Sequence, residues 1–313
     1  MHGSSPLEVN TLVGPEEIKR EDYLVRATAE DGRILAFVAR STELVEEARR
    51  LHNTSPTATA ALGRVLTAAA LMGASLKERQ SLTLRVVGDG PLRAIVATAR
   101  GGAVRGYVGE PQVDLPLNAA GKLDVGAAVG KGVLYVTKDL GLREPYNGSV
   151  PLVSGEIGKD LAYYFAKSEQ TPSAVALGVL VGPAGAVKAA GGYLVQLLPG
   201  AGDGMAARLE ENVQATGPVS RLVSRACTPE DILAALLDGF DVQIHERHFF
   251  RFACDCSRER VREILLALGP EELEKLLAEQ GGAEATCAFC NQVYRFGEGE
   301  LAELVALSRR PEH

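Results

Sequence analysis

Four of the chain's five cysteines lie in two closely spaced pairs near the C-terminus, where their side chains could bind a metal or undergo redox chemistry. The stretch FACDCSRER contains Cys254 and Cys256, and TCAFCNQVYRF contains Cys287 and Cys290. A tetrahedral zinc site needs four soft ligands, which two short loops can supply. A C-x-C pair followed by a C-x-x-C pair gives that number. The sequence therefore predicts that these four cysteines bind one zinc ion per chain.

Two pairs of cysteines could also form structural disulfides or a catalytic dithiol. Stable disulfides are rare in the cytoplasm, where paired cysteines usually indicate metal or redox chemistry. A thioredoxin-like C-x-x-C motif opens a helix, whereas NQVYRF after Cys290 predicts a short strand. His245 and His248 are alternative zinc ligands, but four thiolates already complete the shell. The fifth cysteine, Cys227, has no partner nearby in the sequence and is predicted to be a small buried hydrophobic residue.

The C-x-C pair suggests that the zinc site is not permanent. In an extended strand the Cα atoms of Cys254 and Cys256 would be about 6.6 Å apart, near the upper limit for a disulfide. A disulfide between them would be strained, and strained disulfides are the labile, regulatory ones. Zinc-bound thiolates are also in the form that oxidants attack. Oxidation would expel the metal and unfold the tail, which would make the site a redox switch. The alternative is a permanent zinc ribbon.

Two short helices and a strand are predicted to hold the cysteines in a small C-terminal domain, residues 254–313. The expected inward-facing residues are Val261, Ile264, Leu265 and Leu268 in the helix capped by Ser257, and Leu273, Leu276 and Leu277 in PEELEKLLAEQ. A core of this size rarely contributes more than about 3–5 kcal/mol. Structural zinc contributes on the order of 10–16 kcal/mol in apparent binding free energy. We therefore expect the metal to decide whether this domain is folded.

The upstream sequence predicts a mixed α/β core, residues 22–200, and a helical linker, residues 201–253, so the fold class is α+β. A hairpin is expected around Asp31-Gly32, followed by an apolar core helix that begins at Pro56. In the linker, TPEDILAALLDGF has Thr228 as N-cap and Asp231 in the capping-box position. The segment FDVQIHERHFFRF is predicted to be extended. Residues 1–21 are interpreted as a leader or tag outside the fold.

Composition indicates a globular protein and argues against two classes of partner. Hydrophobic residues make up 46% of the chain, enough for a sizeable core. A net charge of −7 argues against binding that depends on nucleic-acid phosphates. The apolar run AVALGVLVGPAGAV is shorter than the roughly 20 residues that cross a bilayer, and the N-terminus lacks a signal-peptide pattern. We predict a cytoplasmic protein with no nucleic-acid and no membrane partner.

The cysteine spacing and several upstream segments together resemble the redox-regulated bacterial heat-shock chaperone family, the 33 kDa chaperonins. DYLVRA at Asp22 is similar to that family's N-terminal start. Three further segments are similar to its internal signatures: SPTATAALGRVLTAAALM, YNGSVPLVSGEIGKDLAYYFAKSEQTPSAVALGV and AGGYLVQLLPGA. Gly155-Glu156-Ile157 and Ser168-Glu169-Gln170 are the most distinctive pieces. The resemblance extends from Asp22 to the C-terminus.

The resemblance implies a chaperone rather than an enzyme, a holdase that binds unfolding client proteins without hydrolysing ATP. It implies that Cys254, Cys256, Cys287 and Cys290 bind zinc in a reduced, inactive state. On oxidation it implies disulfides Cys254–Cys256 and Cys287–Cys290, loss of zinc, loss of order in the tail and linker, and active homodimers.

A holdase must keep its apolar surface covered until that surface is needed, because a large exposed patch leads to aggregation. We hypothesise that Ile232, Leu233, Leu236 and Leu237 pack on the core in the reduced protein and become exposed on oxidation. The alternative is that this helix stays buried permanently.

The rival function is a constitutive zinc-ribbon module that binds a protein or RNA. The acidic net charge and an aromatic content of 5% count against RNA, because phosphate contacts and base stacking both lack residues. A third class, an oxidoreductase, would turn over a disulfide substrate, which a switch would not do.

Overall fold

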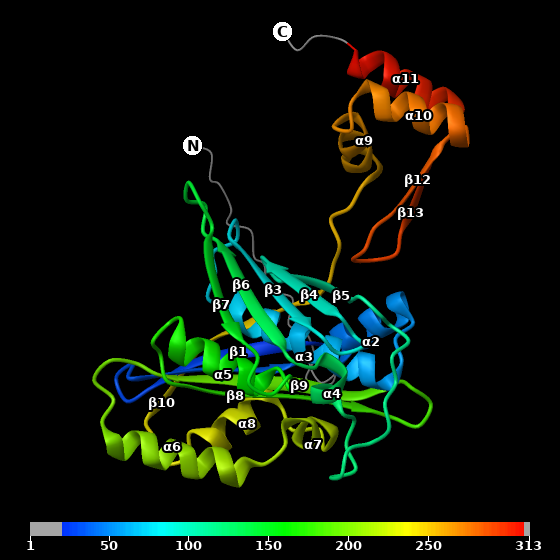
Figure 1. Ribbon diagram of the computed structural model, residues 1–313. Helices are drawn as coiled ribbons and strands as arrows, with labels where there is room; N and C mark the ends of the chain where they lie inside the picture. The colour runs from blue at the N-terminus through cyan, green and yellow to red at the C-terminus, as the bar shows by residue number, and fades with distance from the viewer. Residues whose placement is uncertain (1–20, 310–313) are drawn as a thin grey trace, which may run out of the picture.

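The structure, a computed structural model, describes residues 21–309 and contains two antiparallel-rich sheets with a separate C-terminal module (Figure 1). Residues 1–20 of the expected leader lie outside the described residues. The five-stranded sheet has the order β10 (Val242–Phe249), β1 (Tyr23–Ala29), β2 (Ile34–Arg40), β9 (Val187–Leu197), β8 (Ser173–Val181). All of its neighbouring strands are antiparallel. The hairpin expected at Asp31-Gly32 joins β1 to β2, so that prediction is confirmed.

The six-stranded sheet supplies the surface that meets the C-terminal module. Its order is β11 (Arg251–Phe252), β5 (Ala103–Val108), β4 (Ala94–Arg100), β3 (Ser81–Gly88), β6 (Gly132–Asp139), β7 (Tyr146–Pro151). The two-residue strand β11 pairs with β5 in parallel, and the other pairs are antiparallel. Because β10 and β11 belong to different sheets, the chain passes from one sheet to the other just before the first cysteine pair.

Helix α3 (Pro56–Gly73) lies between the two sheets and forms the centre of the core. Fifteen of its eighteen residues are buried, which confirms the expected core helix beginning at Pro56. Its alanines and glycines let the neighbouring elements approach closely; a Cβ on Gly63 would meet side-chain atoms of Val45 and Val179 at 2.6 and 2.8 Å. Helices α2 (Thr42–His52), α4 (Val125–Val129) and α5 (Gly158–Lys167) complete this core.

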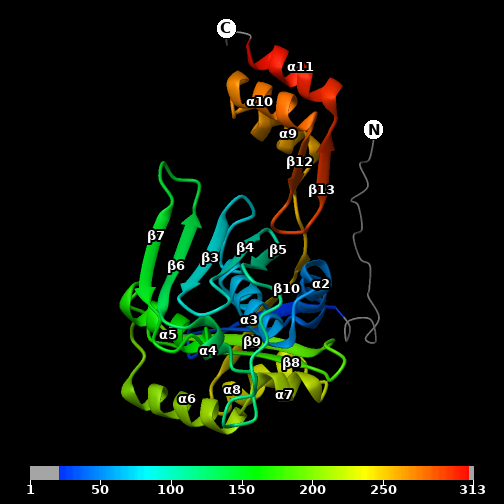
Figure 2. The same cartoon turned by 45° about the vertical axis from the view of Figure 1, so that its right-hand side comes forward.

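Helices α6 (Asp203–Thr216), α7 (Val219–Ser224) and α8 (Pro229–Leu236) cover the face of the five-stranded sheet that points away from α3 (Figure 2). The capping box of α8 is present, because Thr228 Oγ1 accepts from Asp231 N and the Asp231 carboxylate accepts from Thr228 N. Ile232, Leu233, Leu236 and Leu237 are each at most 1% exposed. They pack against side chains of β1, β2 and β9 in one cluster, so the expected packing on the core is confirmed.

The segment expected as linker, residues 201–253, is helical only in its first part. Residues 242–252 form β10 and β11, and β10 pairs with β1 from Tyr23↔Phe249 to Ala29↔Val242. The sequence did predict an extended segment here. What it did not predict is that this segment is a strand of the core sheet, because β10 pairs with β1, which lies far away in the sequence.

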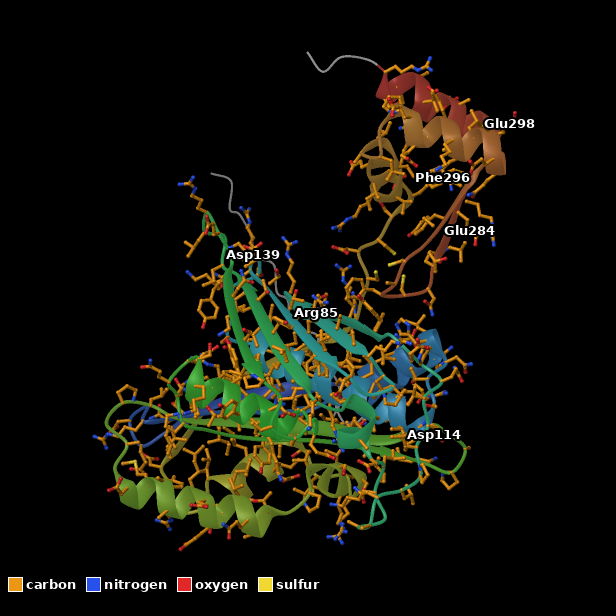
Figure 3. All side chains as sticks on the ribbon, in the orientation of Figure 1. Arg85, Asp114, Asp139, Glu284, Phe296 and Glu298 are labelled. Atoms are coloured by element: carbon orange, nitrogen blue, oxygen red, sulfur yellow. The ribbon has the colours of Figure 1, made fainter. Side chains whose placement is uncertain are left out.

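The C-terminal module, residues 254–309, consists of α9 (Arg258–Leu266), α10 (Pro270–Gln280), β12 (Ala283–Thr286), β13 (Val293–Phe296) and α11 (Glu298–Ser308). Figure 3 shows it standing apart from the core, with Glu284, Phe296 and Glu298 in the module and Arg85 and Asp139 on the six-stranded sheet. The strand predicted for QVYRF is β13.

The module has a small apolar core of its own. Its buried members are Leu265, Leu273, Phe296, Leu301, Leu304 and Val305, and Val261, Leu276 and Leu277 pack against them. The inward face predicted for PEELEKLLAEQ is therefore confirmed. For the preceding helix the prediction was wrong at two positions, since Ile264 is 59% exposed and Leu268 is 48% exposed. Within α9 only Leu265 is buried, so the helix covers a narrow side, and Leu268 lies beyond its end at Leu266.

Candidate metal centre

Two loops of the C-terminal module bring the four predicted cysteines together. Cys254 and Cys256 lie in the extended segment between β11 and α9, where Ser257 caps the helix by accepting from Arg260 N. Cys287 and Cys290 lie in the turn between β12 and β13. That turn is closed by hydrogen bonds from Cys287 N to Gln292 O and from Asn291 N to Cys287 O. Asn291 has the left-handed backbone conformation, φ 58°, which asparagine tolerates well.

The four sulfur atoms all lie within 4.8 Å of one another. The distance between Cys254 Sγ and Cys287 Sγ is 3.7 Å, and that between Cys256 Sγ and Cys290 Sγ is 3.3 Å. A tetrahedral site with metal–sulfur bonds of about 2.3 Å has sulfur–sulfur separations of about 3.8 Å. The cluster therefore has the donor type, number and spacing of a thiolate metal site, and each loop contributes two ligands.

Within residues 21–309 all five cysteines are present as thiols. The two short sulfur–sulfur contacts each join one loop to the other, so the cluster connects the segment that leaves the core to the β12–β13 turn. Cys227 lies apart from the cluster and packs against the apolar cluster under α8, as predicted, but it is only partly buried. His245 and His248 lie on β10 and are not members of the four-residue group.

A cation would relieve the cost of ionising four neighbouring thiols. Burial raises the pKa values of Cys256 and Cys290, and the adjacent cysteines raise that of Cys290 further. Burial also acts on Cys254, but hydrogen bonds from the Cys256 backbone and from side chains that include Arg105 outweigh it, so its pKa is lowered. Tyr294 Oη donates to Cys256 Sγ at 3.2 Å, and this hydrogen bond raises the pKa of Tyr294 to about 12.

Arg105 on β5 connects the cysteine cluster to the six-stranded sheet. Its Nη1 donates to Cys254 Sγ at 3.5 Å and pairs with the carboxylate of Asp255. The same guanidinium lies 4.5 Å from the ring centroid of Phe289, which lies between the two cysteines of the second pair. The Phe289 ring also meets Tyr107 edge-to-face at 5.3 Å. A charged donor beside a thiolate ligand stabilises its negative charge and fixes its orientation.

Helix α2 provides the second contact with the β12–β13 turn. His52 Nε2 lies 2.9 Å from Phe289 O, and Asn291 Nδ2 donates to Leu51 O at 2.7 Å. Burial lowers the pKa of His52 and favours the neutral ring. Sequence reasoning found the cysteines but missed Arg105, Tyr107 and His52. These residues belong to the core domain and carry no local pattern that connects them with the cysteines.

Comparison with known proteins identifies the family. A model of the Hsp33 protein family matches residues 22–297. The 33 kDa chaperonin of Symbiobacterium thermophilum is 58% identical over 285 residues, which cover 90% of this chain and 97% of that protein. The 33 kDa chaperonin of Desulforamulus reducens is 52% identical over 286 residues, which cover 91% and 97%.

A solved structure has the same fold. The crystal structure of the 33 kDa chaperonin from Thermotoga maritima superposes with a TM-score of 0.86 at 42% identity, covering 92% of this chain and 99% of that one. Among residues 21–309 no helix combines the length and apolar character needed to cross a membrane. The α+β class and the chaperone class expected in place of an enzyme agree with these relatives. The chain belongs to the Hsp33 family of chaperones.

Proposed function

We propose that this protein is an ATP-independent holdase whose activity is switched on by oxidation of the cysteine cluster. The observation that carries the proposal is the four-sulfur cluster itself, which joins the segment leaving the core to the β12–β13 turn. The proposed units are the core, residues 22–200, a linker, residues 201–253, and the switch domain, residues 254–313.

In the reduced state Cys254, Cys256, Cys287 and Cys290 would hold one zinc ion. Zinc supplies structural support here, since four thiolates leave no open coordination position for catalysis. The six buried apolar residues of the module form a small core, and a metal worth on the order of 10–16 kcal/mol in apparent binding free energy would dominate its stability. Arg105 and Tyr294 donate to the cluster and hold two of its sulfurs in position.

Oxidation by a peroxide would form two disulfides, Cys254–Cys256 and Cys287–Cys290. Each pair of thiolates gives up two electrons to one peroxide molecule, which takes up two protons from solvent and is reduced to two molecules of water, and the zinc ion is released. Pairing neighbours replaces both contacts between the loops with bonds inside each loop. No thiolate then remains to bind the metal, and the two loops are no longer held together. The module would lose its order for this reason.

Loss of the module would release the linker and uncover an apolar face of the core. Ile232, Leu233, Leu236 and Leu237 now cover Val25, Val38, Tyr193 and Val195 of the five-stranded sheet. Uncovering both sides of this contact would provide the apolar surface that binds unfolded client proteins. The same surface would favour pairing of activated chains into homodimers. Five unpaired cysteines suit the reducing cytoplasm, where we place the protein.

The first experiment measures zinc content and suppression of light scattering on one sample, before and after peroxide under mild heating. We expect about one zinc per chain in the reduced sample and none after oxidation, with anti-aggregation activity appearing as zinc leaves. The matched control is Cys227→Ser, which should behave like the parent, whereas Cys287→Ser should lose zinc without oxidation. Zinc retained in a peroxide-treated sample, together with unchanged activity, would contradict the switch.

A further inference from the structure

Strand β10 covers the edge of β1 but buries almost none of its own side chains. Six of its eight residues are exposed, including Ile244 at 53% and Phe249 at 51%. The opposite holds for β1, where five of seven residues are buried and the remaining two half-buried. The attachment of β10 therefore depends on the backbone ladder from Tyr23↔Phe249 to Ala29↔Val242 and little on packing. Segments with few buried apolar contacts open at low free-energy cost.

The C-terminal end of β10 is held by the parts of the chain that the proposed function expects to lose order. There Glu230 of α8 accepts from Tyr23 Oη at 2.8 Å and from Arg247 Nε at 2.6 Å, which ties α8, β1 and β10 together. From this same end the chain continues through β11 to Cys254. At the N-terminal end Asp241 O accepts from Glu30 N, and Asp241 N donates to Glu30 Oε1.

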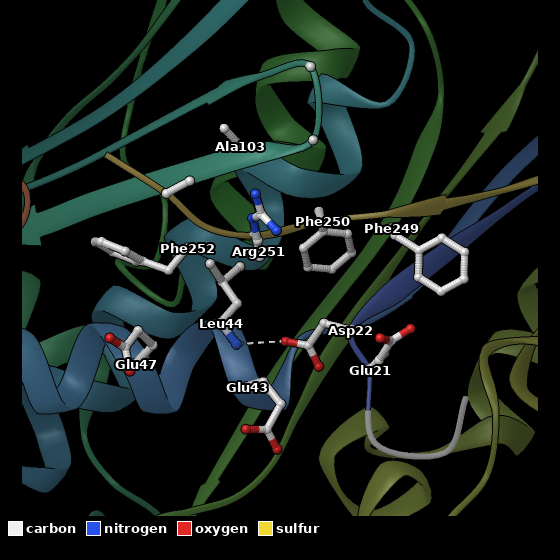
Figure 4. Close-up of a pocket in the computed structure, with 13 residues that line it drawn as sticks. Glu21, Asp22, Glu43, Leu44, Glu47, Ala103, Phe249, Phe250, Arg251 and Phe252 are labelled. Carbon is white, nitrogen blue, oxygen red and sulfur yellow. Dashed lines mark hydrogen bonds between the residues drawn. The ribbon is translucent and has the colours of Figure 1, made fainter. Parts of the chain in front are cut away.

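The exit from β10 is loosely packed as well. A cavity of about 640 Å³ lies along residues 249–253, between Phe249, Phe252 and Leu44 (Figure 4). Asp22, at the start of β1, stays anchored in the core because its carboxylate accepts from Leu44 N at 2.6 Å. Release of α8 and of the C-terminal module would thus leave β1 in place and remove the support at the C-terminal end of β10, which would then be held by the backbone ladder and by the Glu30–Asp241 hydrogen bonds.

We propose that the edge of β1 binds an extended segment of a client protein, which adds to the five-stranded sheet in the place of β10. This inference rests on the proposed function, because it requires that oxidation frees the linker and the module. An uncovered strand edge presents a row of N–H and C=O groups that can pair with any extended chain. Backbone pairing does not depend on sequence, which suits a chaperone with clients of many sequences.

The side chains of β1 define the class of segment that fits. On one side Tyr23, Val25, Ala27 and Ala29 belong to the apolar cluster under α8, and apolar residues of the segment would lie beside them. On the other side Arg26 faces Glu246 of β10, with 3.5 Å between Nη1 and Oε1. The favoured segment is about seven residues long, alternates in polarity, and carries an acidic residue opposite Arg26.

The same register disfavours a second copy of β1 as the occupant. Arg26 is the middle residue of Tyr23–Ala29, so a symmetric antiparallel pair of β1 strands would place two Arg26 side chains opposite each other. Like charges directly opposite in a sheet are destabilising. A client segment can supply the carboxylate that a second β1 cannot.

Hydrogen exchange on the oxidised full chain tests the proposal, with reduced, carboxymethylated α-lactalbumin as a permanently unfolded client. We expect residues 242–249 to lose protection on oxidation and to stay unprotected with client. Alternate amides of residues 23–29 should lose protection on oxidation and regain it with client. Client binding while β10 keeps its protection overturns the proposal although the holdase stands. Absence of both zinc release and client binding rejects the proposed function, and the proposal with it.

A disulfide between β10 and β1 gives a second test. Thr28→Cys with Gln243→Cys joins a directly paired position, where Cα atoms about 5 Å apart suit a disulfide. The control, Ser173→Cys with Gln196→Cys, joins β8 to β9 at the opposite edge of the same sheet. After mild cross-linking and then peroxide, both variants should release zinc. The β1–β10 variant should lose most of its anti-aggregation activity and the control should keep it. Full activity in both, with zinc released, overturns the proposal.

The charge at Arg26 gives a third test. A peptide with the β10 sequence VQIHERHF should bind the oxidised protein about two- to fivefold more tightly than its lysine analogue at the glutamate position. In Arg26→Glu the preference should reverse. Equal binding of both peptides to both proteins would show that no segment is seated opposite Arg26.

Discussion

The guanidinium of Arg105 lies 4.5 Å from the centre of the Phe289 ring, and this contact seats the cysteine cluster on the core. Phe289 lies inside the second cysteine pair, while Arg105 comes from an inner strand of the core domain. The same arginine also donates to Cys254 Sγ, so one side chain contacts both halves of the cluster. A change in the cluster can therefore reach the six-stranded sheet through this residue.

Arg105→Gln should weaken this docking without removing a cysteine. Loss of the stacked, charge-assisted contact should cost about 1–3 kcal/mol. We expect zinc content to stay unchanged in the reduced protein and zinc release under peroxide to become about tenfold faster. The control is Arg85→Gln, which removes a similar cation–π contact, 5.8 Å from Tyr135, elsewhere on the same sheet. Equal release rates in both variants would mean that Arg105 does not connect cluster and core.

Leu236→Ala should partly activate the reduced protein. Leu236, the last residue of α8, is fully buried, and truncating such a leucine costs about 2–5 kcal/mol. That loss falls on the contact between α8 and the five-stranded sheet, so the linker should open more often while zinc stays bound. Anti-aggregation activity of the reduced variant provides the measurement. Ala234→Ser, at an exposed position of the same helix, should leave the reduced protein inactive.

Asp22 should make stability depend on pH. Burial raises the pKa of its carboxyl from 3.8 to about 7, against the lowering effect of its hydrogen bond from Leu44 N. The folded chain then binds this proton more tightly than the unfolded chain does. The resulting stabilisation is fully present below pH 3.8 and is lost as the pH rises through about 7.

Asp22→Asn cannot ionise and should remove this dependence. Between about pH 5 and pH 8 the parent should lose about 3 kcal/mol in unfolding free energy through this group, and the variant should not, since each pKa unit corresponds to about 1.4 kcal/mol. Thermal unfolding of the reduced proteins at both pH values measures it. Asp31→Asn in the exposed β1–β2 turn is the control. A parallel pH response of parent and Asp22→Asn would contradict the assignment.

Removal of metal from the reduced protein should unfold the C-terminal module and leave the core folded. The module's own apolar core is small, whereas α3 is buried between two sheets. With a chelator we expect hydrogen-exchange protection to disappear across residues 258–308 and to persist across residues 56–73. Protection that persists in both regions would show that the module is stable without metal.

Local signals in the sequence predicted much of the structure. The N-cap and capping box of α8, the apolar helix from Pro56 and the hairpin at Asp31-Gly32 each depend on a few neighbouring residues. The two short loops of the cysteine pairs likewise follow from spacing. For Ile264 the helical period was right, but the period does not tell how wide a face the neighbouring helices will cover, and Leu268 lies beyond the end of α9 at Leu266.

By itself the sequence determined the chemistry of this protein: four thiols in two pairs, and a linker helix with one apolar face. Only the tertiary structure decided that β10 is the edge strand of the five-stranded sheet, next to β1, and that Asp22 is buried. It also decided that Arg105 and His52 contact the cysteine-bearing loops. Donor types and periodicity are carried by neighbouring residues, so they can be read along the chain. Contacts between distant segments depend on the summed packing of both sheets, which no short stretch of sequence contains.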